Sequence, residues 1–167
     1  MSKKIGIVMG SNSDLATMQE AVQILKEFEV AFDVHIISAH RSPERAHYYA
    51  VKAEQNYALI IAGAGGAAHL AGVIASLTPI PVIGVPMLTS GLGGLDSLLS
   101  MVQMPSGVPV PTMGIGASGA INAALLAVQI LGVSDSKLRE KMNQYKKKLA
   151  DAVAKKDINA RNALGLG

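Results

Sequence analysis

Short apolar runs alternate with amphipathic segments along the first 132 residues of the chain. The runs are rich in β-branched residues and apolar at consecutive positions, which is typical of strands buried on both faces. Gly, Pro, Ser and Asp residues separate these runs from the segments that follow them. The pattern predicts five strands, at Ile5–Met9, Phe32–Ser38, Tyr57–Ala62, Val82–Val85 and Thr112–Ile115.

Apolar residues at spacings of three and four indicate helices between and after these strands. In the first helix Leu15, Met18 and Val22 share one face, and Asp14 or Ser13 is placed to cap the N-terminus. Pro43 occupies a favoured first helical position in the second helix. The predicted helices run from Asp14 to Phe28, Pro43 to Gln55, Ala67 to Ser76, Leu95 to Val102, Ser118 to Leu131 and Ser134 to Lys155.

Strands that alternate with helices predict a parallel sheet covered by helices on both faces. We expect an α/β fold of three layers, α/β/α, with a five-stranded parallel flavodoxin-like sheet and an extra C-terminal helix. The prediction is a single domain over residues 1–167, with a core over about 4–132 and the C-terminal helix over about 134–155. Ligands bind outside the carboxyl ends of the strands in such folds, so the turns after the first three strands are the candidate sites.

Composition favours a globular protein, because half of the residues are apolar and 16% are charged. The chain has no Cys, which excludes a disulfide framework and a Cys-based metal site or nucleophile. Lys3 and Lys4 precede an apolar run of about five residues, too short for the core of a signal peptide. These features predict a cytoplasmic protein.

Charge is distributed unevenly. Residues 134–167 hold nine Lys or Arg and four Asp or Glu, which is typical of a solvated helical face and not of a nucleic-acid site. Between Gln55 and Ser134 the one charged residue is Asp96. A lone globule has too much surface to leave such a stretch bare of charge, so a membrane or other subunits must cover it. Glycines interrupt the one stretch long enough to span a membrane, Ala58–Leu77, so we expect subunit contacts and no membrane.

The turn after the first predicted strand, Gly10-Ser11-Asn12-Ser13-Asp14, places small hydroxyl residues and backbone N–H groups at a helix N-terminus. Such an arrangement favours an anion, and Asp14 is suited to accept hydrogen bonds from ribose hydroxyls. An ordinary capping loop has the same composition and is the alternative. The turn is neither a dinucleotide-binding glycine motif nor a P-loop.

The turn after the second predicted strand, Ser38-Ala39-His40-Arg41-Ser42-Pro43, combines a phosphate-binding side chain with a titratable one. The planar guanidinium of Arg41 matches a phosphate, and hydroxyls of Ser38 and Ser42 add donors. His40 is the side chain best able to exchange a proton near neutral pH. This turn is the strongest candidate for catalytic chemistry.

The turn after the third predicted strand runs from Gly63 to Leu70 and contains three glycines and His69. Glycines here allow the backbone to approach a planar ligand, although close packing of a helix on the sheet selects the same residues. His69 is either a structural histidine or part of the site. Four histidines without paired carboxylates at ligand spacing argue against a metal site.

Together the three turns resemble the signature turns of the bacterial, class I 5-(carboxyamino)imidazole ribonucleotide mutases. Further segments match that family in order and approximate spacing, and the resemblance spans residues 5 to about 132. Two positions depart from it. The family usually has Pro where Ala71 stands, and often Lys where Ala117 stands. The other matching segments are Gly84-Val85-Pro86, Leu95-Asp96-Ser97-Leu98, Val102-Gln103-Met104-Pro105, Gly107-Val108-Pro109-Val110 and Asn122-Ala123-Ala124-Leu125-Leu126-Ala127.

The resemblance implies an enzyme of purine biosynthesis that moves a carboxyl group within a phosphoribosyl imidazole, with no metal or organic cofactor. It implies a homo-octamer of flavodoxin-like subunits with sites at subunit boundaries. His40 would carry the proton, with His69 as its competitor for that role. The implied substrate-binding residues are Ser38 and Arg41 for the phosphate, Ser11, Ser13 and Asp14 for the ribose and neighbouring polar atoms, and Gly65, Ala67 and Leu70 for the base and the trapped carbon dioxide.

Two alternatives stay open. A related carboxylase uses free carbon dioxide on the uncarboxylated imidazole, and its third turn carries a different pattern. A non-catalytic nucleotide- or flavin-binding module on the same fold would explain the hydroxyl-rich turns but not His40 beside Arg41.

Overall fold

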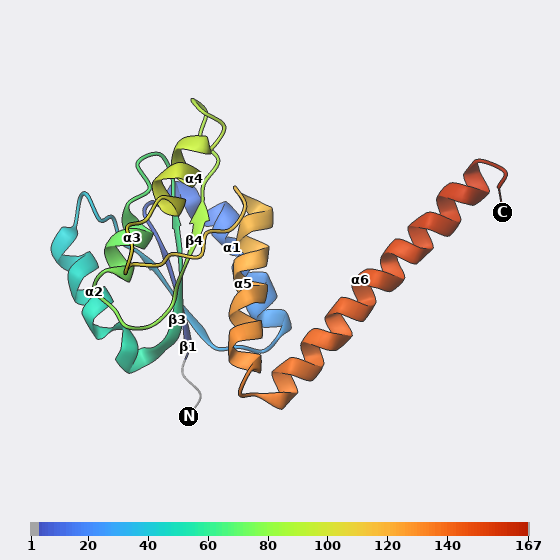
Figure 1. Cartoon of the computed structure of the whole chain (residues 1–167), viewed down its shortest axis with the longest axis horizontal. Helices are drawn as coiled ribbons and strands as arrows, with labels where there is room; N and C mark the ends of the chain where they lie inside the picture. Colours follow the sequence, from blue (N-terminus) through green and yellow to red (C-terminus); the bar gives the residue numbers. More distant parts are fainter. Residues whose placement is uncertain (1–3, 167) are drawn as a thin grey trace. The chain divides into compact units, whose positions relative to one another are not determined.

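The computed structural model describes residues 4–166. The chain forms two compact units, one up to Ala127 and one from Val128 onward, with the boundary inside a helix. The single-domain assignment stays a prediction. The first unit holds the sheet and the helices that precede the boundary (Figure 1).

A four-stranded parallel sheet, in the order β2-β1-β3-β4, organises the first unit. Each strand is close to its predicted position, with β2 ending two residues earlier and β3 two residues later. The consecutive apolar residues explain this arrangement, because β1, β3 and β4 are buried along almost their whole length. The strands are β1 (Lys4–Met9), β2 (Phe32–Ile36), β3 (Tyr57–Ala64) and β4 (Val82–Pro86).

The prediction of a fifth strand at Thr112–Ile115 is wrong. The segment follows the free side of β4 and exchanges backbone hydrogen bonds with it, but forms a single bridge, between Gly84 and Thr112. Pro111 has no N–H to donate, and Gly116 has a φ of +76°, so a regular ladder cannot develop on either side. The chain enters α5 directly afterwards.

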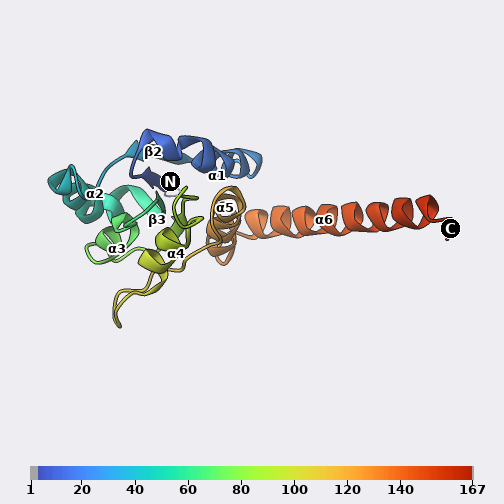
Figure 2. The ribbon, with the colours of Figure 1, turned by 90° about the horizontal axis from the view of Figure 1, so that it is seen from above.

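Helices cover both faces of the sheet. One core cluster joins α2, α3 and Met101 of α4 to Val8, Ile60 and Val82 of the strands. On the opposite face Met18 of α1 lies against Gly63. Viewed from above, α2 and α3 lie across the strands from α1 (Figure 2). The helices are η1 (Asn12–Asp14), α1 (Leu15–Glu27), α2 (Pro43–Asn56), α3 (Leu70–Ala75), α4 (Leu95–Val102) and α5 (Ala117–Gly132).

Small residues bring α2 close to the sheet. Ala46, Ala50 and Ala53 are buried at spacings of four and three, which puts them on one face of the helix. The adjoining strand residues are large, and Ile60 is fully buried. Each such isoleucine stabilises the fold by about 1.5–3 kcal/mol through burial alone. The sheet is thereby a rigid support for the turns at its carboxyl edge.

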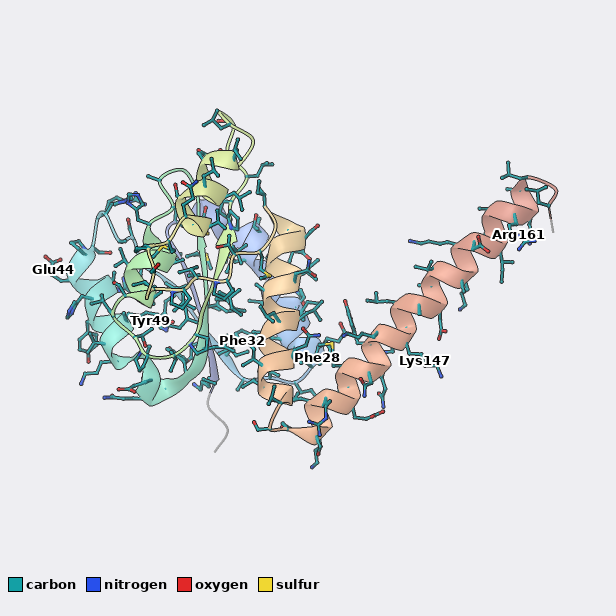
Figure 3. All side chains as sticks on the ribbon, viewed as in Figure 1. Phe28, Phe32, Glu44, Tyr49, Lys147 and Arg161 are labelled. Atoms are coloured by element: carbon teal, nitrogen blue, oxygen red, sulfur yellow. The ribbon has the colours of Figure 1, made fainter. Side chains whose placement is uncertain are left out.

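The second unit contains the end of α5 and the long helix α6 (Ser136–Ala163), which runs further than the predicted Lys155. Asp135 caps α6, because its Oδ1 accepts hydrogen bonds from the N–H groups of Lys137 and Leu138. Side chains project all round the helix, and Lys147 and Arg161 are exposed (Figure 3). Met142 is the one buried residue of α6. Within residues 4–166, no helix has both the length and the apolar character needed to cross a membrane.

Candidate active site

The turns after β1, β2 and β3 meet at the carboxyl edge of the sheet and surround a cavity of about 510 Å³. A backbone hydrogen bond of 3.1 Å from Gly10 N–H to Gly63 C=O ties the first turn to the third. Every site residue expected from the sequence lines this cavity, so residues up to 59 positions apart come together. They are Ser11, Ser13, Asp14, Ser38, His40, Arg41, Gly65, Ala67, His69 and Leu70.

In the first turn, hydroxyl groups and a half-buried carboxylate are arranged around η1. Ser11 caps η1, since its Oγ accepts a hydrogen bond of 3.3 Å from Ser13 N–H. Asp14, one of the two expected caps of α1, occupies the N-cap position of that helix but makes no capping side-chain hydrogen bond. The Ser13 hydroxyl donates to Asp14 Oδ1 at 3.1 Å. Burial raises the pKa of Asp14 from its ordinary value, and hydrogen bonds from the Ser13 side chain and the Ser11 backbone oppose this rise in part.

In the second turn, Arg41 reaches from the end of β2 toward β1. Its Nη2 donates to Gly10 C=O at 3.4 Å, and its Nε and backbone N–H both approach Ser38 Oγ, at 3.4 and 3.2 Å. The long side-chain contacts hold the guanidinium at the cavity wall without a carboxylate partner. A phosphate is a stronger acceptor than these neutral oxygens. The Ser42 hydroxyl donates to Ser38 C=O at 2.9 Å and so stabilises the turn itself.

The two histidines predicted as competitors are in direct contact. His40 Nε2 lies 2.8 Å from His69 Nδ1, and the rings meet edge to face with their centroids 4.9 Å apart. One of these nitrogens must donate and the other accept, so the proton between them fixes opposite roles for the two rings. If both rings carried a positive charge, two N–H groups would face each other. The contact therefore couples the orientation and tautomer of one ring to those of the other.

The glycines of the third turn differ in their surroundings. A Cβ on Gly63 would meet the side chains of Met87 and Met18, so this glycine permits close packing. Gly65 is exposed in the cavity wall, and a Cβ there would lie 3.2 Å from the Cβ of Met87. Gly66 has a φ of +68°, a backbone conformation that favours glycine. Close packing therefore explains Gly63, and the approach of a planar ligand at Gly65 stays a prediction.

The loop after β4 completes the cavity and was missed in the sequence. Met87, Leu88 and Thr89 line it, and Met87 N–H donates to Ala64 C=O at 2.9 Å. The rule that placed the other turns applies equally to the end of β4, so the position was predictable. The residue types gave no signal, because Met and Leu are ordinary core residues. Among the residues that line the cavity, Arg41 is the one cation and Asp14 the one carboxylate.

Known proteins are similar to this chain in sequence and in structure over nearly its whole length. N5-carboxyaminoimidazole ribonucleotide mutase of Pyrococcus horikoshii is 58% identical over 153 residues, covering 91% of this chain and 85% of the relative. The Escherichia coli protein of the same name is 52% identical over 151 residues, covering 90% and 89%.

A crystal structure of Treponema denticola PurE superposes with a TM-score of 0.85 at 26% identity, covering 94% of this chain and 98% of that one. The α/β fold with its parallel sheet therefore matches a solved structure. The AIR carboxylase family matches residues 4–152, which include the sheet, the cavity and every turn that surrounds it. The chain belongs to the AIR carboxylase family.

Proposed function

We propose that the chain is an enzyme of de novo purine (IMP) biosynthesis that catalyses the reaction named for its relatives. It converts N5-carboxyaminoimidazole ribonucleotide into 4-carboxy-5-aminoimidazole ribonucleotide, an isomerisation by carboxyl transfer. The observation that carries this proposal is the meeting of Arg41 and the His40–His69 pair at one cavity, in a chain so similar to proteins named as mutases.

The turns after β1 and β2 bind the phosphate and the ribose of the substrate. Arg41 and Ser38 hold the phosphate, since the guanidinium presents five N–H donors and is held by long contacts that a phosphate would replace. Ser11, Ser13 and Asp14 bind the ribose hydroxyls and neighbouring polar atoms. This division leaves the histidine pair and the third turn to face the reacting part of the substrate.

The reaction begins when the bond between the exocyclic nitrogen and the carboxyl carbon breaks. The electron pair stays on nitrogen, which takes a proton from His40, and carbon dioxide is released into the cavity. The nucleophilic ring carbon attacks carbon dioxide, and the ring C–H proton then returns to His40. The proton is regained, so atoms and charge balance without a metal or an organic cofactor in any step.

In the proposed transfer, His40 Nε2–H donates the hydrogen bond of the 2.8 Å contact and His69 Nδ1 accepts it. This choice of tautomers leaves His40 Nδ1 as the nitrogen that gives and takes the proton. His69 thus holds His40 in the useful tautomer in both charge states. General acid–base transfer by a positioned imidazole contributes roughly 10²–10⁴-fold to the rate.

The released carbon dioxide is neutral, so enclosure and proximity retain it. Gly65, Ala67 and Leu70 line the cavity beside His69, and Leu88 adds an apolar wall from the loop after β4. A gas molecule trapped next to the ring carbon has a high effective concentration for the second step. Exchange of this molecule with solution competes with the carboxyl transfer.

The enzyme is further proposed to be a cytoplasmic homo-octamer with sites at subunit boundaries. Large apolar side chains are exposed along one stretch of the first unit, at Leu88, Leu92, Leu95, Leu99 and Val102, with exposed fractions of 43–73%. This stretch lies inside the segment in which Asp96 is the one charged residue. Such a surface is typical of an obligate interface. Light scattering on the purified protein tests it, and a stable monomer of 17.3 kDa would refute it.

A carboxyl-transfer assay with the carboxyamino substrate tests the reaction. Turnover that is independent of added bicarbonate is the expected result. Turnover of the uncarboxylated imidazole that requires bicarbonate would instead show the carboxylase. Tight binding of the ribonucleotide with no turnover would show a binding module on the same fold.

A further inference from the structure

Asp96 is the one charged residue between positions 55 and 134, and it does not line the cavity. It lies in the first turn of α4, half-buried, among apolar neighbours in the sequence. A lone charge in such a segment has a cost in desolvation unless hydrogen bonds compensate for it. The contacts of Asp96 and the adjacent Ser97 show where that compensation comes from.

The first contact joins α4 to the loop after β4. Thr89 Oγ1 donates a short hydrogen bond of 2.7 Å to Asp96 Oδ1. Thr89 Oγ1 also accepts a hydrogen bond of 3.1 Å from Gly94 N–H. Gly94 directly precedes α4 and has a φ of +85°. Thr89 also lines the cavity. Asp96 thereby fixes one wall of the site.

The second contact joins α4 to the glycine-rich turn. Ser97 is fully buried, and its Oγ accepts a hydrogen bond of 3.0 Å from Gly66 N–H. The hydrogen bond from the Thr89 hydroxyl lowers the pKa of the Asp96 carboxyl, and the backbone and side chain of Ser97 contribute smaller decreases. The carboxylate is therefore ionised at neutral pH, in contact with both loops through Thr89 and Ser97.

A third side chain contributes less. Ser100 Oγ lies 2.8 Å from Asp96 C=O and 3.3 Å from Gly66 C=O. A hydroxyl has one proton, and the shorter contact within the helix takes most of it. The Gly66 peptide therefore depends mainly on Ser97 for its attachment to α4.

The turn from Gly66 to His69 has little regular structure of its own. Ala68 N–H and His69 N–H each donate to the carbonyl two residues earlier, and the helix α3 begins only at Leu70. Gly66 is three residues before His69, so a change in the Gly66 peptide is transmitted along a short, tight segment. His69 Nδ1, which lies 2.8 Å from His40 Nε2, must stay within hydrogen-bond distance of it for the pair to form.

We propose that Asp96 and Ser97 are positioning residues that hold the glycine-rich turn and the loop after β4 in place relative to each other, so that His69 contacts His40. This inference rests on the proposed function for its kinetic consequences, and on the contacts alone for its structural ones. Neither residue touches the cavity. Both act through the turn that carries His69.

Two variants and one matched control test the proposal. Ser97→Ala removes the acceptor for Gly66 N–H without adding volume, and Asp96→Asn keeps the shape of a half-exposed side chain but removes its charge. Thr112→Val is the control, because it removes a half-buried hydroxyl that donates to Val110 C=O at 3.0 Å, away from the cavity. Thermal denaturation of all three measures how far each change destabilises the fold.

The first readout is independent of activity. Imidazole NMR resonances of His40 and His69 are titrated with pH in the wild-type protein and in each variant. Both Ser97→Ala and Asp96→Asn should change the titration of the histidine pair, and Thr112→Val should not. If the wild-type protein lacks carboxyl transfer, the proposed function fails while this readout still decides the positioning role.

The second readout is kinetic. A loss in kcat of about ten- to a hundredfold is expected for Ser97→Ala, as for small displacements of a catalytic group, with KM changed by less than about threefold. Asp96→Asn should show the same split between kcat and KM. Two results would overturn the proposal. The first is an Asp96→Asn variant with wild-type histidine titrations and a wild-type kcat. The second is a loss of kcat in Ser97→Ala that its loss of thermal stability accounts for, judged by the loss of kcat that accompanies destabilisation in Thr112→Val.

Discussion

Replacing His40 by glutamine separates the contact of this side chain with His69 from its ability to titrate. The glutamine amide reaches about as far as Nε2 of histidine, so an N–H donor remains opposite His69 Nδ1, which lies 2.8 Å away in the wild-type protein. An amide does not exchange a proton in the working pH range. Any loss of rate in His40→Gln therefore reports on proton transfer and not on the contact.

The expected loss follows from the role of a general acid and base. Such groups contribute roughly 10²–10⁴-fold to the rate, equivalent to about 3–5 kcal/mol of the activation barrier. His40→Gln and His40→Asn should both lose at least the lower of these amounts in kcat. Binding of the ribonucleotide should persist, because Arg41, Ser38 and the first turn supply its contacts.

His69 provides the matched comparison. In His69→Asn the amide oxygen occupies about the position of Nδ1 and still accepts from His40 Nε2–H, so the useful tautomer is retained. The loss should then be about tenfold or less, the value of a weakened hydrogen bond. In His69→Ala the acceptor is absent and the loss should be larger. When the reaction runs in reverse, solvent deuterium should enter the ring carbon of the carboxyamino imidazole only in proteins that retain His40.

The assay measures binding and turnover separately, by calorimetry with the product and by single-turnover kinetics with the carboxyamino substrate. Near-wild-type turnover in both His40 variants would refute the assignment. A severe loss in His69→Asn together with mild losses at His40 would transfer the role of proton carrier to His69.

Three further predictions concern the cavity wall. Arg41→Lys should weaken binding of the ribonucleotide by about tenfold although the charge is kept, because a point charge replaces the planar fork; unchanged affinity, or an equal loss for a substrate without phosphate, would show that Arg41 is structural. Burial raises the pKa of Asp14 above its ordinary value of 3.8, so ionisation of this group destabilises the fold at neutral pH. Asp14→Asn should raise the Tm of the unliganded protein at pH 7, and the gain should shrink as the pH falls toward 3.8; a gain that is constant with pH would contradict this cause. Gly65→Ala should lower kcat, since its Cβ would lie 3.2 Å from that of Met87 and narrow the cavity, while circular dichroism stays that of the wild type.

Much of the fold follows from local patterns in the sequence. The strands β1, β3 and β4 are consecutive apolar runs, and that pattern places them in the interior of a parallel sheet whatever their neighbours. The segment 112–115 has the same composition, but its hydrogen bonding depends on Pro111 and Gly116, whose effects are decided by the path of the chain along β4. Four of the predicted strands are therefore close to their observed positions, and the predicted number of five strands is wrong.

In the candidate site, too, some features follow from local sequence patterns and others depend on the path of the chain. The topological rule brings His40 and His69 to one edge of the sheet from their positions at strand ends, but their direct contact requires the path of the turn from Gly66 to His69. That path depends on Ser97, which is 31 positions away in the sequence and belongs to a different helix. No local pattern encodes such a partner. The functional roles of the ten expected site residues remain predictions that the variants above test.

The exposure of α6 has a consequence for the concentration dependence of secondary structure. At 1.5 Å per residue, its 28 residues extend over about 42 Å, with Met142 alone buried. Burial normally supplies most of the stability of a helix in a protein, and a bare helix is marginal in water. The far-ultraviolet signal of α6 should therefore decrease on dilution as the proposed octamer dissociates, before the sheet unfolds. Helicity itself thus becomes a measure of assembly.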